Sequence, residues 1–328
     1  MATSGSYDYT LTGTTFANIV AENLGVLAAG ETLSSDDQTL ILARLNLVAK
    51  SLSGNIDLSA GLPVMTRQRV TLFMAEGQQT YLVGPASTDA RASTAYGRTT
   101  IDAAEAIGQT VISVAATTDT ATNPGTTVTM TASDIIGVEQ DDGTIFWSTI
   151  SSVAAGDTVT IGTGLDVAAA VGNYVWWFTS RAQRFVEVEA AVLRDENRND
   201  TRLEVYRTVQ EYDEGVVDKY ADGDPTAILV EPLRIATRVT LNSQPTDVTK
   251  QIVLTVFYPQ EDYDAAANDI AFPQEYLDYL TWQVALRCVP AFGAEWTPAM
   301  QANLTQAMTF AKNLNPEVSN AYFQPGGL

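Results

Sequence analysis

Carboxylates are the side chains in this sequence that could most readily do chemistry, because the chain has 39 Asp and Glu residues and no histidine. Two close pairs, Asp141-Asp142 and Asp222-Gly-Asp224, supply the oxygen ligands that Ca²⁺ and Mg²⁺ prefer. Neither pair matches an EF-hand calcium loop, and both suit the turns in which Asp and Gly are common. We therefore interpret them as turn residues and predict no metal site.

The same inventory disfavours catalysis. Without histidine there is no Ser-His or Cys-His dyad and no His-ligated zinc. Cys288 is the only cysteine, and its place on an apolar helix face favours an inert core thiol over a nucleophile. A pair of carboxylates for glycoside hydrolysis could be chosen almost anywhere among so many acids, so that signal carries little weight. We predict no catalytic residue, no cofactor and a protein that is not an enzyme.

Composition indicates a globular chain of 328 residues, 45% hydrophobic and 17% charged, with a net charge of −21. This charge argues against duplex DNA binding and against docking on anionic lipid, since both need clustered Lys and Arg. The polar opening "MATSGSYDYTLTG" predicts no secretion signal, and no apolar run is long enough to span a membrane.

Two further groups of residues are candidates for partner contacts. Trp147, Trp176 and Trp177 could stack on sugars or bases, but without an accompanying basic cluster we favour core packing and contact with a partner protein. The arginines at 194, 198, 202 and 207 alternate with acids, which favours a mixed-charge hairpin surface, with ion pairs between subunits as the second interpretation.

The elements that position these residues are helical at both ends of the chain. The sequence predicts a helical hairpin over about 14–54, with a capping box at Ser35-Asp-Asp-Gln38, and two strands in 70–83 joined through Glu76-Gly77. From about 88 to 184 the chain is rich in Thr, Ala, Val and Gly, with short strands around an Asp-Gly turn at 141–143. Residues 185–270 predict a hairpin and further strands.

We therefore predict an α+β protein with a discontinuous helical-bundle core that includes β-strands, built from 1–85 and 185–312. Residues 86–184 are expected to be an inserted all-β barrel or sandwich domain. Residues 313–328 are expected to be a C-terminal extended arm, in which Val318, Tyr322, Phe323 and Pro325 would dock on a partner. A disordered terminus is an equally good interpretation of this arm.

The helix predicted over 273–289 has more apolar surface than one buried stripe requires. Leu277, Leu280 and Val284 make one stripe, and a second lies on other faces of the helix. The second stripe consists of Tyr276, Tyr279, Trp282 and Leu286. We expect this stripe to be covered by another subunit. A further helix is predicted to start at Thr297-Pro298.

These motifs, in this order, resemble the head-to-tail adaptors of short-tailed bacteriophages, also called head-tail connectors, tail tubular protein A or packaged-DNA stabilisation proteins. Four stretches carry the resemblance: "FANIVAENLGVLAAGETLSSDDQTLILARLNLVAKSL", "LFMAEGQQTYLVG", "EYDEGVVDKYADGDPTAILVE" and "IAFPQEYLDYLTWQVALRCVPAFG". They cover roughly 1–85 and 185–328. The β insert departs from the smaller members of that family, so its role does not carry over.

The resemblance implies a structural virion protein at the head-tail junction, made in the host cytoplasm, that forms a closed, dodecameric ring. Its implied partners are copies of itself, the portal protein, the tail nozzle protein, and genomic DNA passing without sequence-specific binding. For the insert the alternatives stay open: tail fibres, the nozzle, or water alone. Two other functions stay open from the residues: a surface adhesin or carbohydrate-binding β module, and a carboxylate-dependent cell-wall hydrolase.

Overall fold

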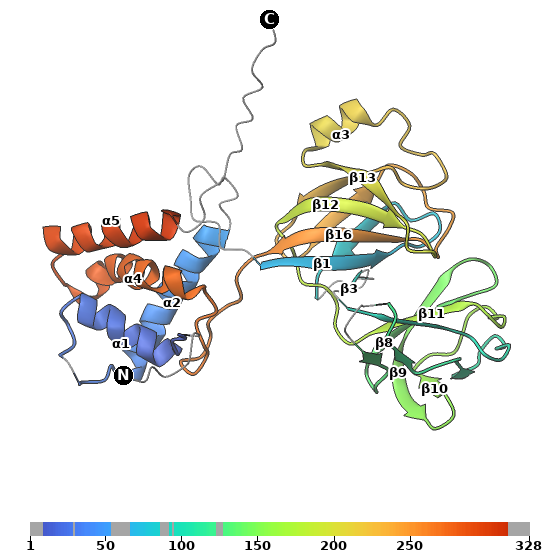
Figure 1. Ribbon diagram of the computed structural model, residues 1–328, viewed down its shortest axis with the longest axis horizontal. Coiled ribbons are helices and arrows are strands. Elements are labelled where there is room, and N and C mark those ends of the chain that lie inside the picture. The colour runs from blue at the N-terminus through green and yellow to red at the C-terminus, as the bar shows by residue number, and fades with distance from the viewer. Residues whose placement is uncertain are drawn as a thin grey trace, which may run out of the picture. The chain divides into compact units, whose positions relative to one another are not determined.

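The structure is a computed structural model that describes residues 9–28, 30–53, 66–85, 92–93, 95–122 and 127–313. Its fold is mixed α+β, as predicted (Figure 1). The chain divides into two compact units. The helical unit combines both ends of the chain, Met1–Met65 and Pro259–Leu328, and the β unit is the continuous segment Thr66–Tyr258.

The helical unit contains four α-helices and one short 3-10 helix among its described residues: α1 (Gly13–Asn23), α2 (Ser35–Ser53), η1 (Gln274–Tyr276), α4 (Leu277–Phe292) and α5 (Pro298–Asn313). Backbone hydrogen bonds join the two ends of the chain, because Gly13 N donates to Asn268 O at 2.8 Å and Ile270 N donates to Leu11 O at 2.8 Å. The side chain of Asn46 both donates to the backbone of Tyr263 and accepts from it. The helical unit therefore depends on segments more than 200 residues apart in sequence.

Local chemistry sets the helix ends, with small shifts from the predicted positions. The Ser34 hydroxyl accepts from Asp37 N at 3.2 Å, so the cap of α2 lies one residue before the predicted box. α4 continues through Pro290 and ends at Gly293, whose φ of 62° suits a left-handed C-cap. The predicted stop at Val289 is therefore wrong, because Pro290 falls in the last turn and the helix tolerates the lost hydrogen bond there. The start of α5 at Pro298 agrees with the prediction.

An eight-stranded sheet forms the larger part of the β unit, in the order β2-β15-β14-β13-β12-β16-β1-β3. Its strand pairs are antiparallel except for β13 with β14. The strands are β1 (Thr66–Phe73), β2 (Thr80–Val83), β3 (Ala92–Ser93), β12 (Glu187–Arg194), β13 (Asp200–Tyr206), β14 (Ala227–Pro232), β15 (Thr237–Leu241) and β16 (Gln251–Tyr258). The short helix α3 (Val209–Gly215) packs Tyr212 on Leu229 and Tyr206.

This sheet is curled around its own core. A single cluster joins Tyr81 of β2, at one edge, with Val70 and Leu72 of β1, near the other edge. In a flat sheet, six strand spacings of about 4.8 Å would separate these strands by roughly 30 Å. Because their side chains share one core, the strands must wrap around it.

A second, six-stranded sheet lies within the β unit, in the order β4-β11-β8-β9-β10-β5. Its strands are β4 (Gly97–Thr100), β5 (Val111–Ser113), β8 (Ile135–Glu139), β9 (Ile145–Ala154), β10 (Thr158–Ile161) and β11 (Tyr174–Phe178), and a separate pair is β6 (Thr118–Asp119) with β7 (Val128–Thr129). All of them fall inside the segment predicted as an all-β insertion. β8 and β9 pair antiparallel around the predicted Asp-Gly turn, with Glu139 opposite Ile145.

The two sheets meet through an aromatic cluster centred on Phe73 of β1. The Phe73 ring stacks on Phe178 of β11 at 5.9 Å and meets Tyr96 edge-on at 5.1 Å. Ile145, Trp176 and Val248 complete the cluster. The six-stranded sheet is therefore packed on the eight-stranded sheet rather than joined to it by linkers alone.

The division of the chain differs from the expected one. The prediction joined the strands of 1–85 and 185–312 to the helices, whereas the units divide at residues 65/66 and 258/259. Strand pairing is the physical reason, since β1 pairs with β16 over its whole length and belongs to the same sheet. Nor do β1 and β2 pair with each other, although only a short turn separates them: β2 pairs with β15 at the opposite edge.

Candidate interaction surfaces

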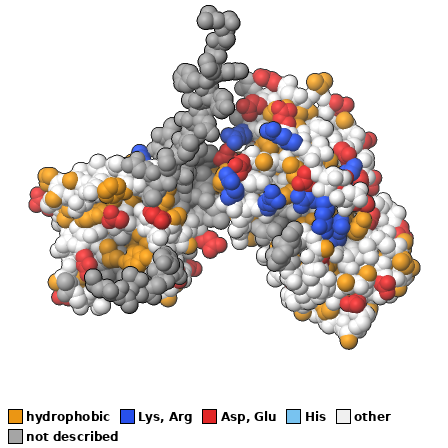
Figure 2. Space-filling model, in the orientation of Figure 1, with side chains coloured by type: hydrophobic (Ala, Val, Ile, Leu, Met, Phe, Trp, Pro, Cys, Tyr) orange, Lys and Arg blue, Asp and Glu red, His pale blue; other side chains and the backbone are white. Residues whose placement is uncertain are grey.

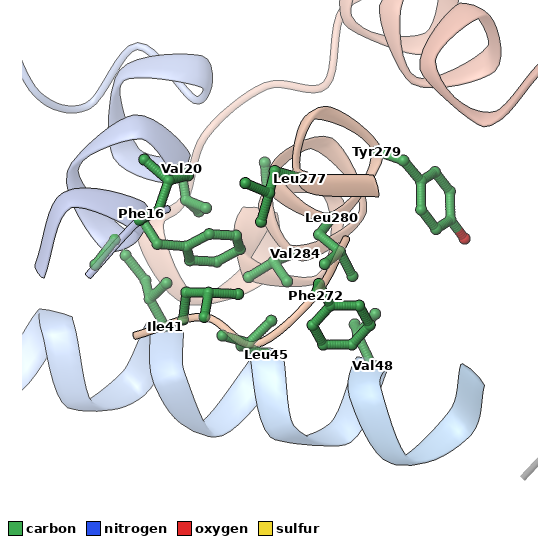
Figure 3. Close-up of a cluster of buried hydrophobic side chains, with 14 of the residues drawn as sticks. Phe16, Val20, Ile41, Leu45, Val48, Phe272, Leu277, Tyr279, Leu280 and Val284 are labelled. Atoms are coloured by element: carbon green, nitrogen blue, oxygen red, sulfur yellow. The ribbon is translucent and has the colours of Figure 1, made fainter. Parts of the chain in front are cut away.

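Helix α4 is the centre of the helical unit, and its first apolar stripe is buried as predicted. Leu277, Leu280 and Val284 point toward Phe16 and Val20 of α1 and toward Leu45 of α2 (Figure 3). Cys288 continues this stripe and is fully buried. Burial raises the pKa of the Cys288 thiol to about 11, so the thiolate is scarce at neutral pH. The residue is an inert core thiol.

The second stripe of α4 is largely covered within the chain. Tyr279 points away from α1 and α2 in Figure 3, yet only 6% of it is exposed, and Tyr276 is 7% exposed. Helix α5 packs against both α4 and η1, and its residues Leu304 and Ala307 belong to the same core. The expectation that these two tyrosines form a subunit interface is therefore corrected. Helix α5 of the same chain packs on α4, where the prediction had placed another copy of the protein.

The other two residues of the second stripe lie at the edge of this core. Trp282 and Leu286 are half-buried and pack against the core cluster. The Trp282 ring meets Trp296 edge-on at 6.4 Å, and the Trp296 indole N–H donates to Gln301 at 3.0 Å. These two positions keep some exposed apolar surface, so they alone of the four predicted interface residues stay accessible to a partner.

The tryptophans of the six-stranded sheet do not form a partner surface. Trp176 is 1% exposed and Trp177 is fully buried, which agrees with the predicted core packing and corrects the predicted partner contact for both. Adjacent residues of a strand point to opposite faces, and both faces of β11 are covered. Trp177 packs in the core of the six-stranded sheet, and Trp176 packs in the aromatic cluster against the eight-stranded sheet. Trp147 is half-buried, with its ring 5.4 Å from that of Phe73.

Asp141 and Asp142 lie in the turn between β8 and β9, as interpreted from sequence. Asp141 Oδ1 accepts from Ala170 N at 2.8 Å, and Asp142 accepts from both the backbone and the hydroxyl of Thr144. The Thr144 contacts lower the pKa of Asp142. Asp224 forms a salt bridge with Lys250 at 2.7 Å. Within the described ranges, no group of three or more acidic or cysteine side chains is placed to hold a metal ion.

Arginines from separate parts of the sequence gather on the side of the eight-stranded sheet that faces away from its core. Arg67 and Arg69 alternate with the core residues Val70 and Leu72 on β1, so they point to the opposite side. Figure 2 shows basic side chains over this part of the β unit. We call this group the basic face: Arg67, Arg69, Arg98, Arg194, Arg198, Arg202 and Arg207.

Three arginines of the basic face have ion-pair partners. Arg67 pairs with Glu189 at 2.8 Å, Arg194 with Asp200 at 2.7 Å, and Arg207 with Glu187. Hydrogen bonds from Arg194 lower the pKa of Asp200. Sequence reasoning found the arginines at 194–207 but missed Arg67, Arg69 and Arg98. Alternation of Arg with core residues in "TRQRVTLF" is the signal that would have indicated the first two.

The predicted docking arm begins where the described residues end. Val318, Tyr322, Phe323 and Pro325 lie outside the described residues. α5 ends at Asn313, the residue at which the arm was predicted to begin.

No helix among the described residues combines the length and the apolar character needed to cross a membrane. In comparisons with known proteins, no family model matches the chain and no curated protein matches its sequence.

Proposed function

We propose that the protein is a non-enzymatic, ring-forming head-to-tail adaptor of a short-tailed bacteriophage virion. In this role it joins the portal protein to the tail nozzle, helps to retain packaged DNA and lines the exit channel. It is made in the host cytoplasm and ends at the head-tail junction.

One observation carries the proposal: the four stretches that resemble the adaptor family occur in order along the chain. The first and the last of them meet in one helical unit. The hairpin α1–α2 packs against α4, which is the helix opened by Phe-Pro in the resembling stretch, and α5 covers the other side. The two ends of the chain are joined by direct hydrogen bonds.

Charge supports a passive role toward DNA. With a net charge of −21, the chain repels the phosphate backbone, so a channel built from its copies would let the genome pass without holding it. The adhesin alternative rests on the Thr-rich β segment and its three tryptophans, and two of these tryptophans are buried. For the hydrolase alternative, the described residues offer no observation that favours it over a structural role.

Binding to the portal tests this proposal. The purified chain is mixed with the portal protein encoded by the same genome, and the mixture is examined by electron microscopy and by co-sedimentation. We expect a ring of the chain below the portal. A chain that neither sediments with the portal nor adds density to it would refute the adaptor role.

The arm is tested in the same assay. The 16 residues 313–328 would span about 50 Å if extended, which is enough to reach along a portal subunit. A variant lacking 315–328 should lose portal binding while its circular dichroism spectrum and melting temperature stay unchanged. Normal attachment of this variant would rule out the arm as the docking element.

A further inference from the structure

The basic face includes arginines that have no ion-pair partner. Among the described residues, no salt bridge involves Arg69, Arg198 or Arg202, and all three are exposed. Arg69 lies on β1, Arg202 on β13, and Arg198 at the turn between β12 and β13. In a chain with a net charge of −21, three exposed arginines without a salt-bridge partner are complementary to an acidic partner.

A groove opens beside these arginines. β12 and β13 pair from Ala191 and Leu203 to Arg194 and Asp200, but β13 then turns to pair with β14 in parallel from Glu204 onward. The separation leaves a groove of about 560 Å³ between these strands, and Arg202, Glu204, Val205 and Arg207 are among its lining residues. This volume accommodates a large side chain of a partner.

The same unit carries a segment with the complementary character. Residues 209–224, the acidic segment, include exposed acids that are in no salt bridge within the described chain: Glu211, Glu214, Asp218 and Asp222. The segment also exposes two apolar side chains, Val217 at 100% and Tyr220 at 79%. Exposed aromatic residues beside charges are typical of protein contacts.

The acidic segment is held in place by its own chain. The Tyr212 hydroxyl donates to Leu241 O at 2.9 Å, and the Gln79 amide donates to Lys219 O. Tyr212 and Val216 pack on Leu229 of β14. These contacts position the segment over β13–β14 and leave the side chains of Val217 and Tyr220 exposed, so both are available to another molecule.

We propose that the basic face and its groove bind the acidic segment of a second copy of this chain. This inference rests on the proposed function, because two different, complementary surfaces on every copy are what a head-to-tail ring requires. A second copy fits better than nucleic acid, since the acidic segment brings the exposed apolar side chains Val217 and Tyr220 together with its acids, and a phosphate backbone has no such apolar groups. Tyr220 of the neighbour enters the groove, and its acids pair with Arg69, Arg198 and Arg202.

A charge-swap experiment tests this proposal on the full chain. One variant reverses the basic face, with Arg69→Glu, Arg198→Glu and Arg202→Glu. A second variant reverses the acidic segment, with Glu211→Lys, Glu214→Lys and Asp222→Lys. Self-association is measured by sedimentation velocity at about 150 mM salt, where the screening length is about 8 Å and charges in direct contact dominate.

We expect each variant alone to associate at least about 100-fold more weakly than the wild type, because like charges meet across the interface. An equal mixture of the two should regain wild-type association, since the reversed face then meets the reversed segment and the remaining interfaces are native. A control with the same net charge change as the basic-face variant, Arg234→Glu, Arg287→Glu and Lys312→Glu, should associate like the wild type.

Three results would overturn the proposal: a wild-type chain that stays monomeric, variants that associate normally, or a mixture that is not rescued. Loss of binding to a DNA fragment by the face variant alone, without rescue in the mixture, would assign the face to nucleic acid instead. Portal binding is scored separately. Rescue without portal binding would support this interface and refute the adaptor role, and the reverse outcome would refute only the interface.

Discussion

At the scale of single residues, Glu139 at the end of β8 is a carboxylate whose charged form is destabilised in the native state. Burial raises its pKa above the ordinary value of 4.5, and the nearby acids Glu196 and Asp247 raise it further. Its Oε2 accepts a hydrogen bond from Tyr174 N at 2.8 Å, which only partly offsets these effects. The native protein therefore binds a proton at Glu139 more readily than the unfolded chain does.

This shift has a defined consequence for stability. Because the pKa of Glu139 is higher in the native state, its contribution favours folding below about pH 4.5 and turns against folding as pH rises through the native pKa. Glu139→Gln keeps an acceptor for Tyr174 N and removes the charge. We expect it to raise the free energy of unfolding at neutral pH by a few tenths of a kcal/mol, and to have little effect below pH 4.5.

Urea unfolding at several pH values, followed by circular dichroism, checks this expectation. Glu295→Gln is the matched control, since Glu295 is exposed, is not among the charges that raise the pKa of Glu139 and should change stability less. A loss of stability in Glu139→Gln at neutral pH would mean that the carboxylate contributes more through its hydrogen bond than it costs through burial.

At the scale of elements, the contact between α4 and α5 decides how the second apolar stripe is used. Tyr279 is a buried aromatic residue in this contact, and burial raises the pKa of its hydroxyl. We expect Tyr279→Ala to lower the free energy of unfolding by about 3 kcal/mol, because it removes a large buried ring and leaves a cavity. Thermal unfolding followed at helical wavelengths measures this loss.

The control for this change is Phe310→Ala on α5, where the side chain is 59% exposed and the expected change is within about 0.5 kcal/mol. If Tyr279→Ala leaves stability unaltered but prevents ring formation, the tyrosine belongs to a subunit interface after all. Loss of stability without such an effect supports the covering role of α5.

At the scale of the whole molecule, the continuous segment 66–258 contains every strand of both sheets, and the helical unit is assembled from the two chain ends. We expect the fragment 66–258 to fold alone, because its cores are complete without the helices. Its melting temperature should lie within about 5 °C of the β-sheet transition of the full chain.

The complementary fragments test the other unit. Neither 1–65 nor 259–328 alone should show a cooperative transition, since α4 needs both α1–α2 and α5 to bury its two stripes. An unfolded 66–258 fragment would show that the β unit depends on the helices for its stability.

Several features of this protein follow from its sequence alone. The helical ends, the caps at the starts of α2 and α5, the β-rich middle and the place of Asp141 and Asp142 in a turn depend on local patterns: apolar spacing, Asp and Ser at helix starts, and Asp-Gly steps between strands. The inert character of Cys288 also follows from its position on an apolar stripe.

Tertiary structure alone decided where long-range partners lie. Apolar spacing in the sequence indicates that Tyr279 and Trp176 need to be covered. It does not show whether α5, a second sheet or another molecule covers them. Strand order is equally non-local: β1 pairs with β16, more than 170 residues away, instead of with its neighbour β2, and only this pairing brings Arg69 into the same sheet as Arg202. Such contacts depend on which distant surfaces fit together, and no local pattern encodes that fit.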